Sequence, residues 1–246
     1  MENTAYVSLS SQAALWRQME VVANNMANAN TPAFKSEVAM FKEYSVKTKS
    51  DATPFGRKIS YVQDVGMLRN TAEGPLASTG APLDVAIHGD GYFTLDTPSG
   101  PRFTREGHFR LDETGMVVTA AGYPVLQQND QPIVVAPNEA NITIAADGTI
   151  STENGNIGKL KLVKFENEQD LTKAGNGSYQ TTSDPSPVDK PVLSQGMLEQ
   201  SNVQPILEMT HMMKILRTYE GVQNMLQNEH DRQIKAMPIL SQSQQA

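Results

Sequence analysis

The residue types that most often carry out chemistry are present, but they do not form a catalytic pattern. Four histidines occur, at positions 88, 108, 211 and 230. No two of them have the helical spacing with a glutamate between that holds zinc in hydrolases. A Gly-x-Ser-x-Gly nucleophile turn is also absent. The Gly89-Asp90-Gly91 turn lacks the following helix and lysine of a phosphate-binding loop. The sequence therefore predicts no catalytic, cofactor-binding or metal-binding residues.

Carboxylates in the middle of the chain are the one set that could act on a substrate. A glycosidase needs two of them at a fixed separation, and sequence spacing leaves that possibility open. Asp90, Asp112 and Asp147 lie beside or near glycine in predicted turns, where aspartate bonds to its own backbone. A secreted β-rich hydrolase is therefore kept as an alternative class, and a clustered-carboxylate cleft would reveal it.

Composition excludes several other classes. The 246 residues carry a net charge of −7 and no cysteine. A nucleic-acid surface would need a dominant basic stripe, and disulfides and thiolate metal sites need cysteine. No apolar segment approaches the ~20 residues of a membrane span. Residues 1 to 11 lack the basic start and apolar block of a secretory signal, so we expect any export to use no cleaved signal.

The first element predicted along the chain is a helix at the amino end. Apolar residues recur from Ala5 in alternating steps of four and three, which is typical of a helix that packs against other helices. Asn28, Asn30 and Pro32 should end this helix. The stripe consists of Ala5, Leu9, Gln12, Trp16, Met19, Ala23 and Met26.

A second helix is predicted at the carboxyl end, with Asn202 as its N-cap and an end near Ala236, before Pro238. Gly221 should cost ~1 kcal/mol relative to alanine. It is either a tolerated defect or a site where a neighbouring helix approaches closely. The apolar stripe consists of Met209, Met212, Leu216, Tyr219, Val222 and Leu226, flanked by Ile206, Met213 and Ile215.

The middle of the chain alternates short β-type runs with turn residues from Leu83 onward. Many strands without intervening helices predict a sandwich or barrel-like domain. The polar residues 36 to 78 show little periodicity, and 182 to 200 begins with three closely spaced prolines, so both are predicted to be linkers. The expected organisation is a terminal helix over 1–35, an extended linker over 36–78, a β-rich domain over 79–181, a linker over 182–200 and a terminal helix over 201–246.

Two such helices need partners, because most helical stability in proteins comes from burying the apolar face. They could pack back onto the β-domain as in an ordinary α+β protein, and spacing alone leaves this open. Alternatively, many copies bury one another's helices, and head-to-tail contacts that do not close produce a helical filament. A trimeric coiled-coil adhesin would need a longer uninterrupted repeat than either end offers.

Three segments resemble the family of flagellar rod and hook proteins. Residues 23–35, ANNMANANTPAFK, are similar to the signature ANNxANxxTxGFK at the amino end of that family. Residues 83–93 with 103–107, and residues 196–203, resemble later parts of the family in the same order. Residues 1–9 and 19–22 look most like a proximal-rod member, with a distal-rod or hook-type subunit as the alternative.

The resemblance implies a mostly β central domain with terminal α-helices that pack together in a helical assembly. It implies a structural subunit, not an enzyme, that polymerises with copies of itself and with other rod proteins into a tubular drive shaft for motility. Such a subunit is exported through the flagellar type III apparatus and becomes part of the basal-body rod in the periplasm. It needs no cofactor, nucleic acid or membrane span.

The expected assembly interface lies on the two helix stripes. We further expect the helices to be disordered or only partly helical in the monomer and to order when subunits stack, because ordering costs ~1 to 2 kcal/mol per residue. The predicted interface residues are Leu9, Trp16, Met19, Ala23, Met26, Met209, Met212, Met213, Leu216, Tyr219, Val222 and Leu226.

The family resemblance also assigns structural roles to single residues. The amides of Asn24, Asn25 and Asn28 should satisfy backbone groups near the helix end or bridge to a neighbouring subunit. Phe34 should anchor the turn, and Lys35 should begin a mobile linker. Thr31, Ser201, Asn202 and Val203 are the remaining motif positions. Ala33 stands where the family usually has glycine and follows Pro32, so we expect no positive φ there.

Overall fold

The computed structural model describes residues 2–48, 57–136 and 141–243. The chain divides into two compact units. The first, called here the helical unit, combines residues 1–27, 37–68 and 204–246. The second, called the β unit, combines residues 28–36 and 69–203. Both termini belong to the helical unit, and the β unit is formed almost entirely by the middle of the chain.

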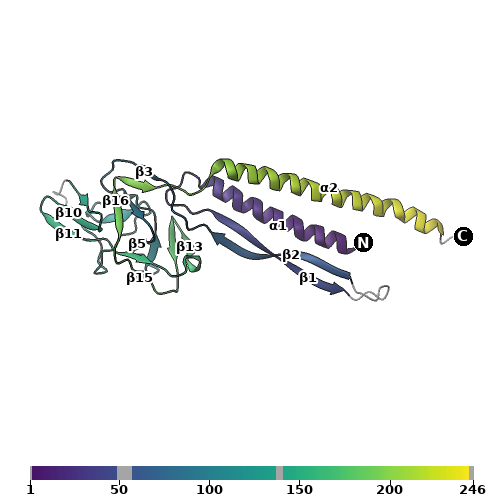
Figure 1. The fold of residues 1–246 in the computed structure, drawn as a ribbon, viewed down its shortest axis with the longest axis horizontal. Helices are drawn as coiled ribbons and strands as arrows, with labels where there is room; N and C mark the ends of the chain where they lie inside the picture. Colours follow the sequence, from purple (N-terminus) through teal and green to yellow (C-terminus); the bar gives the residue numbers. More distant parts are fainter. Residues whose placement is uncertain (1, 49–56, 137–140, 244–246) are drawn as a thin grey trace. The chain divides into compact units, whose positions relative to one another are not determined.

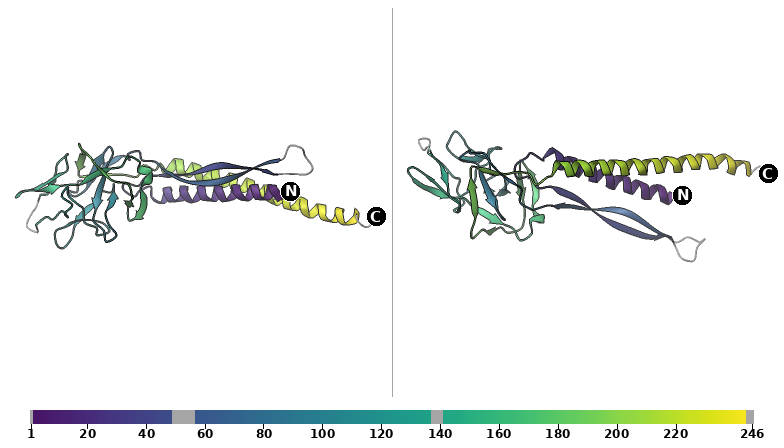
Figure 2. Two further views of the ribbon diagram at one scale, coloured as in Figure 1. Left: turned by 90° about the horizontal axis from the view of Figure 1, so that it is seen from below. Right: turned by 45° about the horizontal axis from the view of Figure 1, so that its top comes forward.

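The helical unit consists of two long helices and a two-stranded sheet. Helix α1 (Glu2–Ala27) and helix α2 (Pro205–Ser243) lie side by side in opposite directions, so that both chain ends lie at the same end of the pair (Figures 1 and 2). Strands β1 (Glu37–Thr48) and β2 (Arg57–Arg69) pair with each other, and β1 packs along α1. The predicted pair of terminal helices that pack together is confirmed.

Over its described residues, 28–36, 69–136 and 141–203, the β unit contains fifteen short strands and one 3-10 turn. Its largest sheet has the order β13-β14-β6-β5-β12-β15, and the neighbouring strands in it are antiparallel. The ladders do not close into a barrel within the described residues. The strands are β3 (Leu76–Ser78), β4 (Val85–His88), β5 (Tyr92–Leu95), β6 (Arg102–Thr104), β7 (Phe109–Leu111), β8 (Val117–Thr119), β9 (Thr143–Ile144), β10 (Thr149–Thr152), β11 (Gly155–Lys159), β12 (Leu162–Lys164), β13 (Thr172–Gly175), β14 (Ser178–Gln180), β15 (Ser186–Pro187), β16 (Val192–Gln195) and β17 (Met197–Glu199), with the turn η1 (Glu168–Asp170) after β12.

Two apolar clusters hold the β unit together. The larger includes Val85, Phe93, Val125 and Ile133, all with none of their surface exposed. The smaller is largely aromatic, and the ring of Tyr92 meets those of Phe165 and Tyr179 edge-on at 5.8 and 5.9 Å between centroids. A buried β core of this kind, independent of the terminal helices, agrees with the predicted β-rich middle domain.

The two linker predictions were wrong. Residues 37–48 and 57–69 form β1 and β2, while residues 49–56 of the first predicted linker lie outside the described residues. Residues 186–187, 192–195 and 197–199 form β15, β16 and β17, which pair with β12, β4 and β3. Strands β1 and β2 were missed because they expose apolar residues such as Val38 and Val65 as well as polar ones. The alternation of apolar and polar residues that identifies a half-buried strand is therefore weak in both. Leu193 and Leu198, buried after the prolines, are the signal that was overlooked in the second.

The bounds of the second helix also differ from the prediction. Helix α2 begins at Pro205, with the Glu208 N–H donating to the Gln204 carbonyl at 3.1 Å, so that proline occupies the first helical position, where a missing N–H costs nothing. The helix continues past Pro238 to Ser243. An internal proline removes one backbone bond but does not force a helix to end. Neither helix is long and apolar enough to cross a membrane, as far as the described residues extend.

Candidate functional site: the helix faces and the clasp

The inner face of α1 packs within the helical unit. Its least exposed residues recur in steps of three and four, which places them on one side of the helix. Val21, Val22 and Asn25 are buried, and Ser8 is 2% exposed. Leu15 and Gln18 are half-buried between them. This face differs from the stripe predicted from the sequence, because polar Ser8 and Asn25 belong to it.

The inner face of α2 also packs within the helical unit. Met212, Ile215, Tyr219, Val222 and Leu226 recur in steps of three and four and are half-buried or buried. A pocket of about 300 Å³ remains between the inner faces and β1. Apolar residues of all three elements line it, and its polar rim comes mainly from α2. The residues that line it are Leu15, Gln18, Val21, Val22, Glu37, Val38, Ala39, Glu208, His211, Lys214, Ile215 and Thr218.

The outer faces of both helices carry large apolar side chains that nothing in the described part of the chain covers. On α1, Leu9 and Trp16 are 60% and 56% exposed. On α2, Met209, Met213 and Leu216 are 54%, 49% and 40% exposed. Among the described residues, the strongly exposed large apolar side chains lie in the helical unit, with three exceptions, Leu111, Val134 and Val192. Such a concentration is typical of a protein interaction surface.

The predicted interface residues are therefore divided between two faces. The outer faces hold Leu9, Trp16, Ala23, Met209, Met213 and Leu216, which are exposed. Met19, Met26, Met212, Tyr219, Val222 and Leu226 are half-buried. The predicted stripe mixed the two faces, because apolar residues occur on both sides of each helix.

The amide of Asn25 joins α1 to the start of β1. Its Nδ2 donates to the Glu37 carbonyl at 2.9 Å, and its Oδ1 accepts from the Glu37 N–H at 3.0 Å. The side chain is buried and satisfies the backbone of the first strand residue in the way a neighbouring strand would. The prediction that this amide satisfies backbone groups was right in kind, but the backbone belongs to β1 and not to the helix end. Asn28 serves the turn itself, since its side-chain oxygen accepts from the Thr31 hydroxyl at 3.2 Å.

A buried ion cluster lies where the family motif of the amino end meets that of the carboxyl end. The Glu199 carboxylate receives Lys35 Nζ at 2.6 Å, Arg105 Nε at 2.5 Å and the Gly74 N–H at 2.8 Å. The three charged side chains are each at most 4% exposed. Burial lowers the pKa of the Lys35 amine, an effect larger than the opposing influence of Glu199. Lys35 is therefore a fixed part of the β unit, and the prediction that it begins a mobile linker was wrong.

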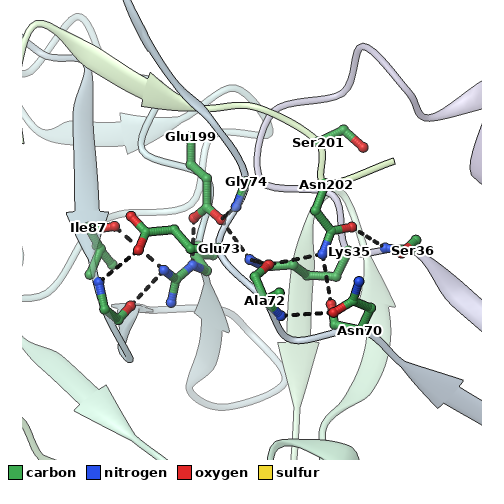
Figure 3. A network of polar contacts seen from close by, with 12 residues as sticks. Lys35, Ser36, Asn70, Ala72, Glu73, Gly74, Ile87, Glu199, Ser201 and Asn202 are labelled. Atoms are coloured by element: carbon green, nitrogen blue, oxygen red, sulfur yellow. Dashed lines mark hydrogen bonds and ion pairs between the residues drawn. The ribbon is translucent and has the colours of Figure 1, made fainter. Parts of the chain in front are cut away.

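The segments on either side of this cluster pair with each other, and we call residues 33–36 together with 199–203 the clasp (Figure 3). The Ala33 N–H donates to the Glu199 carbonyl at 2.8 Å, and the Asn202 N–H donates to the Phe34 carbonyl at 3.2 Å. The Asn202 side chain accepts from the Ser36 N–H at 2.8 Å and donates to the carbonyls of Asn70 and Ala72, both at 2.9 Å. Asn202 thus ties three segments together and is not the predicted cap of α2.

The remaining motif residues complete the clasp. The Ser201 hydroxyl accepts from the Val203 N–H at 3.2 Å, and both residues are buried. Phe34 is half-buried, with the Lys173 ammonium 4.8 Å from its ring centre. Ala33 has φ of +56° and is buried, so the predicted absence of a positive φ was wrong. The close backbone bond to Glu199 holds alanine in a conformation that glycine adopts at lower cost.

Sequence reasoning missed Arg105 and Glu199 as partners of Lys35. Both lie inside the segments that carry the family resemblance. The sequence shows their residue types there but not which side chains they contact. Arg105 also donates to the carbonyls of Gly89 and Gly91, at 2.7 and 3.1 Å, which fixes the turn between β4 and β5. Lys35 is the only charged residue in residues 23–35, and Arg105 is the only lysine or arginine in residues 83–93 and 103–107. Such single basic residues are the signal that could have indicated a buried carboxylate.

The acidic residues of the β unit have local roles. Asp112 Oδ1 accepts from the N–H groups of Thr114 and Met116 at 2.9 and 2.8 Å, and Asp147 accepts from the Thr149 N–H at 3.1 Å. The bond from the Thr114 hydroxyl, followed by these backbone bonds, lowers the pKa of the Asp112 carboxyl group, and the bond from the Thr149 N–H lowers that of Asp147. This is the turn-forming role that the sequence indicated. In the described part of the chain, His, Asp and Glu side chains form no group of three or more that could hold a metal ion.

Three protein-family models match the chain. Residues 6–35 match "Flagella basal body rod protein", residues 86–152 match "Flagellar hook protein FlgE/F/G D1 domain" and residues 194–237 match "Flagellar basal body rod FlgEFG protein C-terminal". The first and last of these segments contain most of both outer faces and all of the clasp except Ser36.

Curated relatives carry the same names over nearly the full length. The flagellar basal-body rod protein FlgF of Caulobacter vibrioides is 38% identical, covering 93% of this chain and 94% of its own. FlgF of Rhizobium meliloti is 36% identical over 99% of this chain and 100% of its own, and FlgG of Bacillus subtilis is 31% identical over 90% and 92%. The resemblance seen in the motifs is confirmed. The chain therefore belongs to the family of flagellar basal-body rod proteins, in which the similarity supports FlgF over FlgG.

Proposed function

We propose that this protein is a structural subunit of the flagellar basal-body rod, without catalytic activity, and that it polymerises through its terminal helices. The observation that carries the proposal is the exposed apolar outer face of each helix, in the segments that the rod-family models match. Enzymes concentrate convergent polar groups in a cleft. Here the conspicuous surface is apolar and extended instead.

Burial of these faces supplies the driving force for assembly. Covering one leucine or methionine side chain completely is worth about 1.5–3 kcal/mol, and the partly exposed side chains here supply a fraction of that each. The inner faces already pair α1 with α2, so a neighbouring subunit covers the outer faces without unfolding the pair. We expect the helices to be only marginally stable in an isolated subunit and to become fully ordered when neighbours cover them.

The partners and location follow from the same role. The subunit assembles with copies of itself and with other rod proteins in the basal body, the structure for which its relatives are named. We propose that it reaches the growing tip through the flagellar type III export apparatus and that the finished rod crosses the periplasm. A proximal position is favoured by the FlgF relatives, and FlgG relatives make the distal rod the alternative. Localising labelled subunits in purified basal bodies separates the two positions.

The proposed polymerisation is tested by Leu216→Asp. A carboxylate on the outer face of α2 must be desolvated when a neighbour covers it, so we expect loss of rod incorporation and of motility, with the β unit still folded. Gln223→Asp is the matched control, because this exposed residue lies on the same face beyond the apolar part. Normal motility of cells carrying Leu216→Asp would overturn the proposal.

A further inference from the structure

The buried contact between Lys35 and Glu199 holds an amine against a carboxyl group (Figure 3). Lys35 Nζ lies 2.6 Å from Glu199 Oε1, and the two side chains are 3% and 1% exposed. A bond of 2.7 Å from the same Nζ to the Ala72 carbonyl fixes the position of the amine. Reacting groups held in contact behave as if present at about 10⁵–10⁸ M, which offsets the entropy that opposes amide formation. Burial also keeps away the water that would hydrolyse an amide.

We propose that Lys35 and Glu199 condense to an amide, an isopeptide bond, after the β unit has folded. The bond that forms joins Lys35 Nζ to Glu199 Cδ, and the bond that breaks is the one between Cδ and Oε1. Oε1 leaves as water together with two protons of the ammonium group, and the third proton stays on the amide nitrogen. The ion pair is the reactant, and no oxidant, cofactor or other molecule is consumed.

The protonation states that the reaction needs are reached inside the pair. Amide formation requires an uncharged amine and a protonated carboxyl group. Transfer of one proton from Nζ to Oε1 converts the ion pair into that form without an outside acid or base. Burial lowers the pKa of the Lys35 amine, which makes its uncharged form more accessible. Arg105 favours the ionised carboxylate of Glu199, so the uncharged pair is a minor population and the reaction is slow.

Fixed donors face the oxygens on which negative charge develops. Arg105 Nε lies 2.5 Å from Glu199 Oε2, and the Gly74 N–H lies 2.8 Å from Oε1. When the amine adds to Cδ, both oxygens carry part of the negative charge. Donors that are already in place in a water-excluded site stabilise such charge without reorganisation. Oε2, held by Arg105, becomes the amide oxygen, and Oε1, which faces the amine, takes up the protons and leaves.

A second carboxyl group, that of Glu168, is available to relay protons and to balance charge. It is half-buried, burial raises its pKa, and it interacts electrostatically with Lys35 and Arg105. A carboxyl group with a raised pKa is better suited to exchanging protons at neutral pH than an ordinary glutamate. The amide removes one positive and one negative charge from the cluster, which leaves Arg105 with Glu168. No uncompensated buried charge results.

The amide would change how force passes through the subunit. It would join residue 35 to residue 199 covalently, whereas α1 ends before residue 35 and α2 begins after residue 199. Tension between the two helices would then be carried by the amide and not by the strands of the β unit. In a rotating shaft this would protect the β unit from unfolding. Only this consequence rests on the proposed function, because the bond itself forms within one subunit.

Mass spectrometry of the denatured full-length protein tests the proposal directly. We expect the wild-type chain, purified and kept folded at neutral pH, to become lighter than its sequence by one water molecule. Tryptic digestion should yield a branched peptide that contains both Lys35 and Glu199. Lys35→Arg keeps the positive charge but lacks the amine, so it should keep its full mass. Lys173→Arg is the control, because this lysine is exposed, and it should still lose water.

The wild-type result is decisive even if a variant folds poorly. A full sequence mass after prolonged incubation, or a loss of water located at other residues, would overturn the proposal. Glu168→Gln should slow the loss of water on the order of 10²-fold, and an unchanged rate would contradict the relay of protons by Glu168. Polymerisation is tested separately by Leu216→Asp, so failure of the amide leaves the proposed function intact.

Discussion

At the scale of single residues, the carboxylate of Glu199 is the point where three distant segments meet. It is the counter-ion that Lys35 and Arg105 share, and both of these side chains are almost fully buried. A buried ion pair contributes little net stability relative to an apolar replacement, but loss of one partner leaves the others as uncompensated buried charge. The main effect of the cluster is therefore on specificity. The β unit is stable only when the motif segments that carry Lys35 and Glu199 lie next to each other.

Glu199→Gln should destabilise the β unit by roughly 3–5 kcal/mol, because glutamine keeps the shape but leaves two buried cations without an anion. Urea unfolding of the full-length protein, followed by circular dichroism, measures the change. Glu20→Gln is the control. Its carboxylate pairs with Arg17 at 3.2 Å on the surface, where such a pair is worth no more than about 1 kcal/mol. A cost for Glu199→Gln as small as that of the control would contradict this account of the cluster.

Ala33→Gly should stabilise the protein, even though glycine usually destabilises. The positive φ of Ala33 costs an L-residue about 1–2 kcal/mol, while glycine adds about 0.4–1 kcal/mol of entropy to the unfolded chain. The expected net gain is on the order of 0.5–1 kcal/mol, seen as a higher urea midpoint. Ala29→Gly, at a residue without positive φ, should lower the midpoint instead. A lower midpoint for Ala33→Gly would show that the buried methyl group outweighs the strain.

The residue roles were predictable only in part. The Asp112 and Asp147 turns could be inferred because their bonds are to residues two to four positions away. The partner of Lys35 could not, since Glu199 is 164 residues distant and nothing local distinguishes it from a surface glutamate. Similarly, the proline before Ala33 argued against a positive φ at Ala33. Only the bond from the Ala33 N–H to the Glu199 carbonyl shows why Ala33 adopts this conformation.

At the scale of elements, the sequence predicted both helices, but the predicted interface stripes mix residues of the inner and outer faces. Helical periodicity identifies a helix whichever side is apolar, whereas the choice of side needs a contrast between apolar and polar faces. On α2, Ile215 is inside and Leu216 outside, so the contrast is lost. On α1, buried Ser8 and Asn25 look polar in the sequence. Apolar residues on both faces are themselves the mark of a helix with partners on both sides.

Gly221→Ala tests the two interpretations of the glycine within α2. An added methyl group would meet nothing within 4 Å in the subunit, so alanine should raise the thermal stability of the helix by up to ~1 kcal/mol. Far-ultraviolet circular dichroism measures this in the isolated protein. Asn224→Ala, at another exposed position of α2, is the control and should give a smaller gain of the same sign. A lower thermal stability would mean that the glycine has a role inside the subunit.

The assembled rod gives the second part of that test. If the glycine is a tolerated defect, Gly221→Ala subunits incorporate as well as wild type. If a neighbouring helix approaches at this position, incorporation falls although the isolated subunit is more stable, and Asn224→Ala does not reproduce the loss.

At the scale of the whole molecule, the division into units does not follow the order of the chain. Residues 28–36 follow α1 directly but belong to the β unit, and residues 199–203 precede α2 but pair with them. The domain boundaries predicted from composition fell between residues 35 and 36 and between residues 200 and 201. Both positions lie inside the clasp. Composition cannot locate such a boundary, because the bonds that define it connect residues more than 160 positions apart.

The clasp therefore predicts how the β unit must be cut to fold alone. A fragment of residues 28–203 keeps the clasp and should unfold in one cooperative urea transition. A fragment of residues 36–200 loses Lys35, the Ala33 bond and Asn202, and leaves Arg105 with a carboxylate that no longer has its second cation. We expect it to be less stable by about 3 kcal/mol or more, because it loses several hydrogen bonds of Ala33, Lys35 and Asn202, each worth about 0.5–1.5 kcal/mol. Equal stability of the two fragments would mean that the clasp joins the ends of the β unit without supporting its fold. The contribution of the clasp would then be confined to joining the segment that follows α1 to the segment that precedes α2.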